Sequence, residues 1–211
     1  MRIVIRCNPA QREELIYNGV HDDAALAWAF EKDDLLQHSS VDAVLDLMYE
    51  TEPDSLPILK QLPGLKIINS VLFTLQETDP SFIRINGWPT FLKAPIIEAS
   101  SHHADLKKVA AMVFALFHKT IEWLPDAPGF VVPRIVSMIV NEAFFALAEG
   151  ISTQEEINTA MKLGTAYPYG PFEWGEKLGL QNIARLLAKL GAQQKRYVPA
   201  PLLLQQASEI Q

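Results

Sequence analysis

Histidine is the side chain best suited to move protons near neutral pH. The chain contains five histidines, and two of them, His102 and His103, are adjacent in the stretch Ser-Ser-His-His-Ala-Asp. Adjacent side chains do not face one site, and no cysteine or further histidine lies at metal-ligand spacing from the pair. The pair is therefore interpreted as a loop or a helix cap, and the sequence predicts no metal site.

A second chemical signal follows the first expected strand, residues 2–7. The next residues, Asn8-Pro9-Ala10, predict a helix N-terminus, because Asn is a good N-cap and Pro fits the first turn. A helix N-terminus attracts anions, but a dinucleotide-binding corner normally carries G-x-G-x-x-G at this place. The first glycine of the chain is Gly19, and Pro9 has no N–H to donate. The sequence therefore predicts at most a weak phosphate contact through Asn8.

Strands are expected to alternate with helices in the first part of the chain. Expected strands are residues 2–7, 41–47, 65–70, 82–86, 96–99 and 120–124, and expected helices are 10–16, 22–37, 56–62 and 106–118. This alternation predicts an α/β sheet domain over residues 1–125. Beyond it, helical signals follow one another at about 131–149, 153–163, 171–178, 180–193 and 199–209. Residues 126–211 are therefore expected to form an all-α domain.

The composition is that of a soluble globular protein. Hydrophobic residues make up 49% of the 211 residues and charged residues 20%, which allows a sizeable core. A net charge of −7 argues against a nucleic-acid partner. The single cysteine, Cys7, excludes an internal disulfide and fits a reducing compartment. No signal peptide or membrane span is expected, so the predicted location is cytoplasmic.

The helical part contains several long and specific motifs. They are DAPGFVVPR at 126–134, a capping box at 153–156, YPYGPFEW at 167–174 and RYVPAPLL at 196–203. Together they resemble the C-terminal helical domain of 3-hydroxyacyl-CoA dehydrogenases, whose usual strings read roughly D-x-P-G-F-V-x-N-R and Y-P-M-G-P-F-E-L. The resemblance implies that the first part is a shortened, Rossmann-like domain with a parallel sheet.

The resemblance also implies a homodimer, because the helical domain is the dimer interface of that family. The expected helix at 131–149 is apolar nearly all round and needs cover on every side. A domain of this size can hardly supply that cover alone. We therefore expect the chain to pair with a second copy of itself through its helical part.

Site residues are also implied by the resemblance. The family uses a His as general base, oriented by a Glu, while a Ser and an Asn hold the substrate oxygen. When residues 82–98 are laid on the family's motif, Glu98 retains the Glu position and Asn86 stands at the His position. Ser70 is the polar neighbour of the Ser position, and Pro133 replaces the Asn. An amide cannot accept a proton at neutral pH, so the general base is expected to be absent and Glu98 to have lost its partner.

Two functions remain open on this reading. The first is a degenerate relative that binds an acyl-CoA-type ligand, or serves structurally, without a cofactor and without efficient hydride transfer. The second is an active NAD-dependent 3-hydroxyacyl-CoA or 3-hydroxybutyryl-CoA dehydrogenase of fatty-acid metabolism. The first is favoured because the phosphate corner and the base are altered independently. The alternative for Glu98 is an ordinary solvated carboxylate, since most Glu side chains are exposed.

Overall fold

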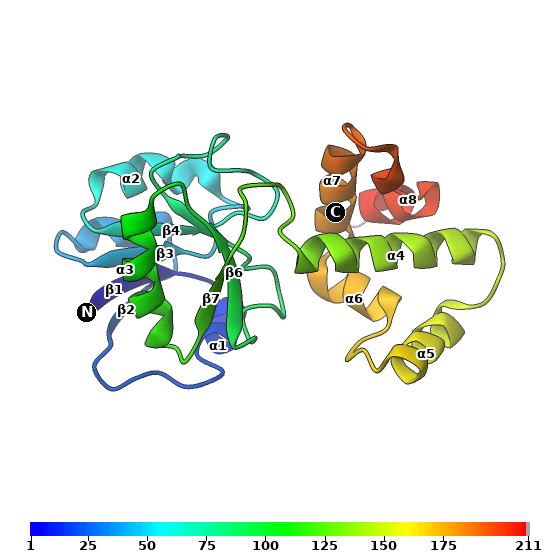
Figure 1. The fold of residues 1–211 in the computed structure, drawn as a ribbon, viewed down its shortest axis with the longest axis horizontal. Helices are drawn as coiled ribbons and strands as arrows, with labels where there is room; N and C mark the ends of the chain where they lie inside the picture. Colours follow the sequence, from blue (N-terminus) through cyan, green and yellow to red (C-terminus); the bar gives the residue numbers. More distant parts are fainter. Residues whose placement is uncertain (210–211) are drawn as a thin grey trace. The chain divides into compact units, whose positions relative to one another are not determined.

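The computed structural model describes residues 1–209, so residues 210–211 of the expected helical domain lie outside the described residues. The chain forms two compact units, Met1–Phe130 and the residues from Val131 onward. The first unit contains the sheet and the second contains only helices (Figure 1).

Within the described residues, the first unit is built on a seven-stranded sheet of order β2-β1-β3-β4-β5-β6-β7. The strands are β1 (Arg2–Arg6), β2 (Ala25–Ala29), β3 (Ala43–Asp46), β4 (Leu65–Asn69), β5 (Ile83–Ile85), β6 (Ile96–Ser100) and β7 (Thr120–Trp123). Neighbouring strands are parallel except for β5 and β6. The expected α/β, Rossmann-like fold is confirmed.

The sheet is not parallel throughout as expected, because β5 and β6 are antiparallel. Residues 86–95, which join β5 to β6, contain no helix. A parallel crossover needs a dozen or more residues and usually a helix, so the chain instead returns antiparallel. As a result β6 and β7 run opposite to the other five strands.

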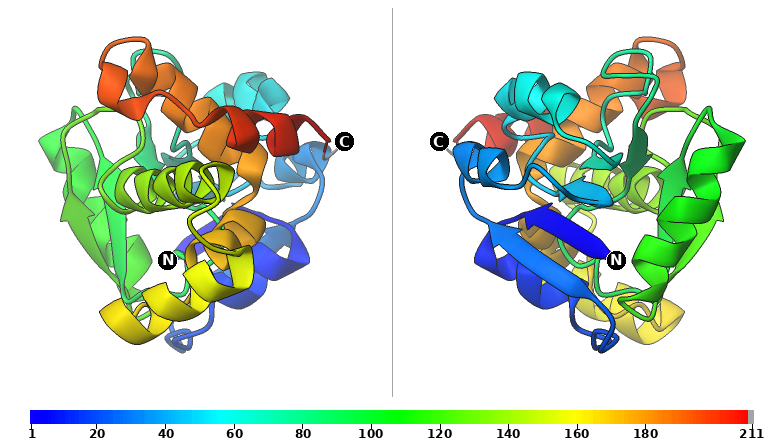
Figure 2. Two further views of the ribbon diagram at one scale, coloured as in Figure 1. Left: turned by 90° about the vertical axis from the view of Figure 1, so that its right-hand side faces the viewer. Right: turned by 90° about the vertical axis from the view of Figure 1, so that its left-hand side faces the viewer.

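Helices cover both faces of the sheet (Figure 2). The helix α1 (Pro9–Leu15) and the helix α3 (Ala104–Ala115) pack on one face, where Leu15 and Phe114 join Ile5 in a buried core. The opposite face is covered by the 3-10 helix η1 (Lys32–Gln37) and the helix α2 (Leu56–Gln61), which follows the 3-10 turn η2 (Pro53–Ser55). There Leu35 and Leu59 pack on Val4 and its neighbours. Both faces of the central strands are therefore buried, as is usual for parallel sheets.

The expected helix at residues 22–37 is wrong. The structure has the strand β2 there, followed by η1. β2 pairs with β1 in register from Arg2 and Ala25 to Arg6 and Ala29. The alanine-rich sequence favours a helix locally, but pairing along the free edge of β1 overrides that preference.

The connection out of the sheet, residues 126–130, is fixed to the strands. The Asp126 carboxylate accepts a hydrogen bond from Leu75 N (2.9 Å) and forms an ion pair with the buried Arg84. The Arg84 guanidinium also lies over the Phe130 ring, 4.1 Å from its centroid. These contacts explain why this segment belongs to the sheet unit up to Phe130.

The second unit has the expected succession of helices. They are α4 (Val132–Ala148), α5 (Gln154–Thr165), α6 (Pro171–Leu178), α7 (Leu180–Gly191) and α8 (Pro201–Glu209), with a 3-10 turn η3 (Lys195–Tyr197) before the last. Phe144 of α4 meets Phe172 of α6 edge to face, with ring centroids 5.1 Å apart. The buried Asn141 of α4 accepts a hydrogen bond from Ala200 N (2.8 Å), which ties α4 to the segment before α8.

Within residues 1–209 no helix has both the length and the apolar character that a membrane crossing requires.

Candidate functional site

The candidate site lies at the edge of the sheet where β1, β3, β4 and β5 end. From β1 the chain moves to β2 on one side and then returns to β3 on the other, so the order reverses at β1. In open α/β sheets, ligands bind outside the carboxyl ends of the strands at such a switch point. The residues that follow these strands are therefore the first place to look for chemistry.

Asn86 and Glu98 are held together at this edge. Asn86 directly follows β5, Glu98 lies in β6, and the backbone N of Asn86 donates to the carbonyl of Glu98 (3.0 Å). The side-chain amide nitrogen Nδ2 of Asn86 also donates to Glu98 Oε2 (3.0 Å). Glu98 is only 8% exposed, so it is not an ordinary solvated carboxylate, and Asn86 takes the place of the histidine partner that it lacks.

This pair can orient a ligand but cannot remove a proton through Asn86. The amide nitrogen has no basic lone pair, and its Oδ1 accepts from Trp88 N (3.4 Å). Both ends of the amide are therefore fixed. What remains at the place where the resemblance puts a general base is a hydrogen-bond donor joined to a buried carboxylate.

Glu50 and Trp88 form a second buried polar contact that the sequence analysis missed. Trp88 Nε1 donates to Glu50 Oε1 (2.7 Å), and Leu72 N donates to the other oxygen of Glu50 (2.7 Å). This contact joins the segments after β3, β4 and β5. The available signal was a Glu placed soon after a buried strand, since buried carboxylates need partners.

Ser70 follows β4 and is fully buried. Its hydroxyl donates to the carbonyl of Phe73 (2.9 Å), and its N donates to the carbonyl of Ile85 (3.2 Å). The structure thus places Ser70 in the same edge region as Asn86, with its hydroxyl shaping the loop after β4.

Asn8 is the N-cap of α1, as expected. Gln11 N donates to Asn8 Oδ1 (2.9 Å), and Asn8 N donates to Gln11 Oε1 (3.0 Å), which completes a capping box. Pro9 has no N–H. Two of the backbone donors that a phosphate would seek at this helix end are therefore already hydrogen-bonded within the chain.

A line of hydrogen bonds, the carboxyl-edge belt, runs across the strand ends. It consists of Gln11 Nε2 to the carbonyl of Leu47 (2.8 Å), Asn69 Nδ2 to the same carbonyl (3.1 Å) and Gly87 N to Asn69 Oδ1 (2.9 Å). Gly87 permits this approach, because a Cβ there would lie 2.8 Å from Cγ of Asn69. The belt links α1 to the ends of β3, β4 and β5.

Arg6, the last residue of β1, is fully buried and forms what we call the Arg6 cluster with Asp46, Glu52 and Ser55. Its Nη1 lies 3.2 Å from Asp46 Oδ2, its other terminal nitrogen pairs with Glu52, and Ser55 Oγ donates to Asp46 (2.7 Å). Burial raises the pKa of Asp46, while the nearby Arg6 charge opposes that rise. Sequence analysis did not assign this cluster.

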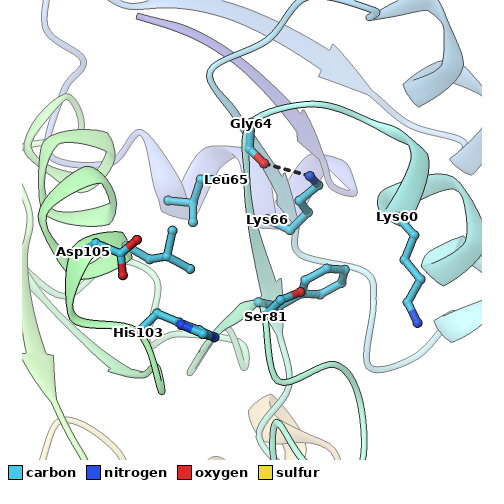
Figure 3. A pocket seen from close by; sticks show the side chains of 9 residues that line it. Lys60, Gly64, Leu65, Lys66, Ser81, His103 and Asp105 are labelled. Carbon is cyan, nitrogen blue, oxygen red and sulfur yellow. Dashed lines mark hydrogen bonds between the residues drawn. The ribbon is translucent and has the colours of Figure 1, made fainter.

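A separate pocket of about 350 Å³ lies at the opposite edge of the sheet, where β4 begins (Figure 3). Its lining includes Lys60, Lys66 and His103. Lys66 Nζ donates to the carbonyl of Gly64 (2.8 Å), and Lys60 pairs with Asp79 (3.1 Å). None of Ser70, Asn86 and Glu98 lines this pocket, so it is distinct from the candidate site.

His102 and His103 lie in the loop before α3, and His103 is the N-cap residue of that helix. His102 Nε2 lies 3.3 Å from Asp126 Oδ2. In residues 1–209 no three His, Cys, Asp or Glu side chains are grouped in a way that could hold a metal ion.

Fold and motifs together define a protein with a Rossmann-like sheet domain followed by a helical domain, and comparison with known proteins identifies its family. The family model for the 3-hydroxyacyl-CoA dehydrogenase C-terminal domain matches residues 129–210. A probable 3-hydroxybutyryl-CoA dehydrogenase from Deinococcus radiodurans is 38% identical over an alignment of 187 residues, and the match covers 81% of this chain and 67% of that protein. The chain therefore belongs to the 3-hydroxyacyl-CoA dehydrogenase family.

Other relatives share a smaller part of their length. The 3-hydroxyadipyl-CoA dehydrogenase of Escherichia coli is 47% identical over 91 residues, 42% of this chain but only 19% of that protein. The structure of the (S)-3-hydroxybutyryl-CoA dehydrogenase PaaH1 from Ralstonia eutropha has a TM-score of 0.75 at 20% identity and covers 99% of this chain and 93% of that one. That similarity shows the shared fold.

Proposed function

We propose that the chain is a degenerate member of its family that binds an acyl-CoA-type thioester without efficient hydride transfer. The observation that carries this proposal is the Asn86–Glu98 pair. A hydroxyl substrate must lose a proton as its hydride leaves, and an amide at the place of the base cannot take that proton. The second N–H of the Asn86 amide, beside the one bonded to Glu98, can donate a hydrogen bond to a carbonyl oxygen.

The surroundings support a binding role for this edge. Asn86, Glu98, Glu50 and Trp88 are all at least nine-tenths buried. Their mutual hydrogen bonds fix each polar group before a ligand arrives, and such preorganisation lowers the entropic cost of binding. A thioester carbonyl is the part of an acyl-CoA that a fixed amide donor would orient.

The dinucleotide that the family resemblance implies does not fit the residues present. The turn after β1 has no glycine, and the capping box of Asn8 and Gln11 engages the helix-end donors. NAD therefore takes no part in the proposed function.

The second candidate is an active NAD-dependent 3-hydroxybutyryl-CoA dehydrogenase of fatty-acid metabolism. It is favoured by the identity of 38% with the Deinococcus radiodurans protein and by the burial of Glu98. This activity requires another group to act as the base in place of Asn86.

Calorimetric titration with acetoacetyl-CoA tests the proposal, with free CoA as the control ligand. We expect saturable binding of acetoacetyl-CoA that exceeds the binding of CoA. Asn86→Ala should weaken acetoacetyl-CoA binding about tenfold, which corresponds to the loss of one hydrogen bond. Equal affinity for CoA and acetoacetyl-CoA, or no effect of Asn86→Ala, would contradict a thioester site at this edge.

We also propose that the helical unit pairs with a second copy of the chain. A pocket of about 200 Å³ beside α4 is lined by apolar and aromatic side chains, among them Ile135, Ile139 and Tyr167. Ile135 is 53% exposed in the single chain. A contiguous apolar surface of this kind is typical of an interface.

A reducing, cytoplasmic setting remains part of the proposal. Burial raises the pKa of the Cys7 thiol to about 11, so the thiol stays protonated at neutral pH. A buried, protonated thiol is chemically inert and is compatible with a reducing compartment.

A further inference from the structure

We propose that side chains of this protein take the structural place of the dinucleotide at the carboxyl end of β1. The Arg6 cluster and the capping box of Asn8 and Gln11 close the corner, so the sheet unit needs no nucleotide to hold its strand ends together. This inference rests on β1 and α1 and is separable from the proposal about Asn86.

The backbone donors of this corner are already hydrogen-bonded within the chain. A pyrophosphate binds at this corner through backbone N–H groups of the turn and the first helical residues. In this chain Asn8 N is bonded to Gln11 Oε1, Gln11 N is bonded to Asn8 Oδ1, and Pro9 offers no N–H. A phosphate would have to displace both side chains before it met those two donors.

The charges at this corner are already neutralised. Arg6 is the last residue of β1, and a lone guanidinium there would attract phosphate. However, Arg6 is paired with two carboxylates, Asp46 and Glu52. The nearby Lys32 is likewise paired with Asp54. Arg6 and Lys32 are therefore both neutralised by carboxylates, and the Arg12 guanidinium of α1 lies over the Trp28 ring, 4.6 Å from its centroid.

Side-chain contacts also join the ends of β1 and β3 to the elements around them. Arg6 and Asp46 are register partners, so their ion pair closes the last rung of the β1–β3 ladder. Asp46 also accepts from Ser55 Oγ (2.7 Å) and Met48 N (3.0 Å), which anchors the chain after β3. Gln11 Nε2 adds a link from α1 to the carbonyl of Leu47. The protein itself thus joins the elements that surround a bound dinucleotide in this fold class.

The first test is a titration of the protein with NADH and with NAD⁺. Binding is measured by the heat released in calorimetry and by the change in melting temperature. We expect no saturable heat and no rise in Tm at about millimolar nucleotide. A ligand present at a hundredfold its Kd would raise the Tm by several degrees. Saturable NADH binding with a Kd of about 10 µM or tighter, accompanied by that rise, would overturn the inference.

Variants of the ion pair test the structural role. Arg6→Met leaves a buried carboxylate without its guanidinium and should lower the Tm by on the order of 10 °C. The double variant Arg6→Met with Asp46→Leu removes both charges and should recover most of that loss. The matched control Lys32→Met breaks the exposed pair with Asp54 and should change the Tm by no more than about 2 °C.

The possible results distinguish the structural role of the Arg6 cluster, nucleotide binding and thioester binding. An Arg6→Met protein as stable as the wild type would overturn the structural role. If that variant fails to fold, the milder Ser55→Ala variant, which removes one hydrogen bond to Asp46, decides, and an unchanged Tm would overturn the role. NADH binding without turnover would overturn this inference and leave the proposed function in place. Absence of both NADH and acyl-CoA binding would contradict the thioester proposal alone.

Discussion

Asn86 lies beside the buried carboxylate of Glu98, at the position where the family has its general base. Its amide side chain can donate and accept hydrogen bonds but cannot take up a proton at neutral pH. The motif around residues 82–98 was sufficient to align Asn86 with Glu98, because the match is local in sequence. The Arg6–Asp46 and Glu50–Trp88 contacts join residues 40 and 38 positions apart. No local pattern connects such residues, so their pairing could not be predicted from the sequence.

The isosteric change Asn86→Asp tests the fixed pair. It places a second carboxyl group beside buried Glu98, where two like charges cannot both be accommodated. We expect the free energy of unfolding at about pH 8 to fall by about 2–4 kcal/mol. One pKa of this variant pair is raised on folding, so the folded state holds the extra proton and the loss grows as pH rises above about 4.

Urea unfolding at about pH 5 and pH 8 measures this effect, with Asn86→Ala as the uncharged control. The control should lose stability to a similar extent at both values. If Asn86→Asp matched the wild type at the higher pH, the pair would not be buried as described.

Lys119 gives a second pH-dependent prediction. Its side chain is only 2% exposed, its Nζ donates to the carbonyl of Ala94 (3.0 Å), and burial lowers its pKa to about 8. The folded state therefore releases this proton before the unfolded state does. The stability cost of burying the charge is present below about pH 8 and is relieved as pH rises toward the unfolded pKa of about 10.4.

The difference in unfolding free energy between wild type and Lys119→Met measures this term. Between about pH 7 and pH 9.5, the free energy of unfolding of the wild type should rise relative to that of Lys119→Met by about 1–2 kcal/mol. This magnitude is reduced to allow for partial solvation of the side chain. Cys7 has a raised pKa and gives the opposite trend above about pH 8.5, but it is present in both proteins and cancels. A flat difference would show that Lys119 titrates normally.

At the scale of elements, caps and turns were the predictable part. The capping box of Thr153 and Glu156 marked the start of α5, and Asn8 with Pro9 marked the start of α1. The strand β2 was missed because its alanines favour a helix and its pairing with β1 is a tertiary effect. The reversal of β6 and β7 likewise depends on the connection after β5.

Gly87→Ala tests the carboxyl-edge belt that joins these elements. The added Cβ would lie 2.8 Å from Asn69 Cγ, so the amide must move and its hydrogen bonds weaken. We expect a loss of about 1–3 kcal/mol in the free energy of unfolding.

The matched control is Gly164→Ala in α5, where an added Cβ meets nothing within 4 Å. There the same substitution should stabilise by about 0.5–1 kcal/mol, because alanine favours a helix more than glycine. If Gly87→Ala and Gly164→Ala changed the free energy of unfolding in the same way, Gly87 would not be constrained by the carboxyl-edge belt.

At the scale of the whole molecule, family membership followed from the helical motifs, whereas the proposed lack of hydride transfer rests on a few positions in the sheet unit. Light scattering at micromolar concentration tests the proposed pairing through the helical unit. We expect a dimer for the wild type and a monomer for Ile135→Asp, because a charge would then lie in the apolar contact. The control Tyr17→Asp changes an exposed aromatic of the sheet unit and should leave the dimer intact. A wild-type monomer would contradict the pairing.

The most direct measurement of the central claim is hydride transfer itself. The 211-residue protein at micromolar concentration is mixed with acetoacetyl-CoA and NADH, and the loss of NADH absorbance is followed. With an amide at the base position and a corner closed by Arg6, we expect no loss above the protein-free blank. NADH oxidation that depends on the protein and reaches about 1 s⁻¹ or more, the range of ordinary enzymes, would contradict the account.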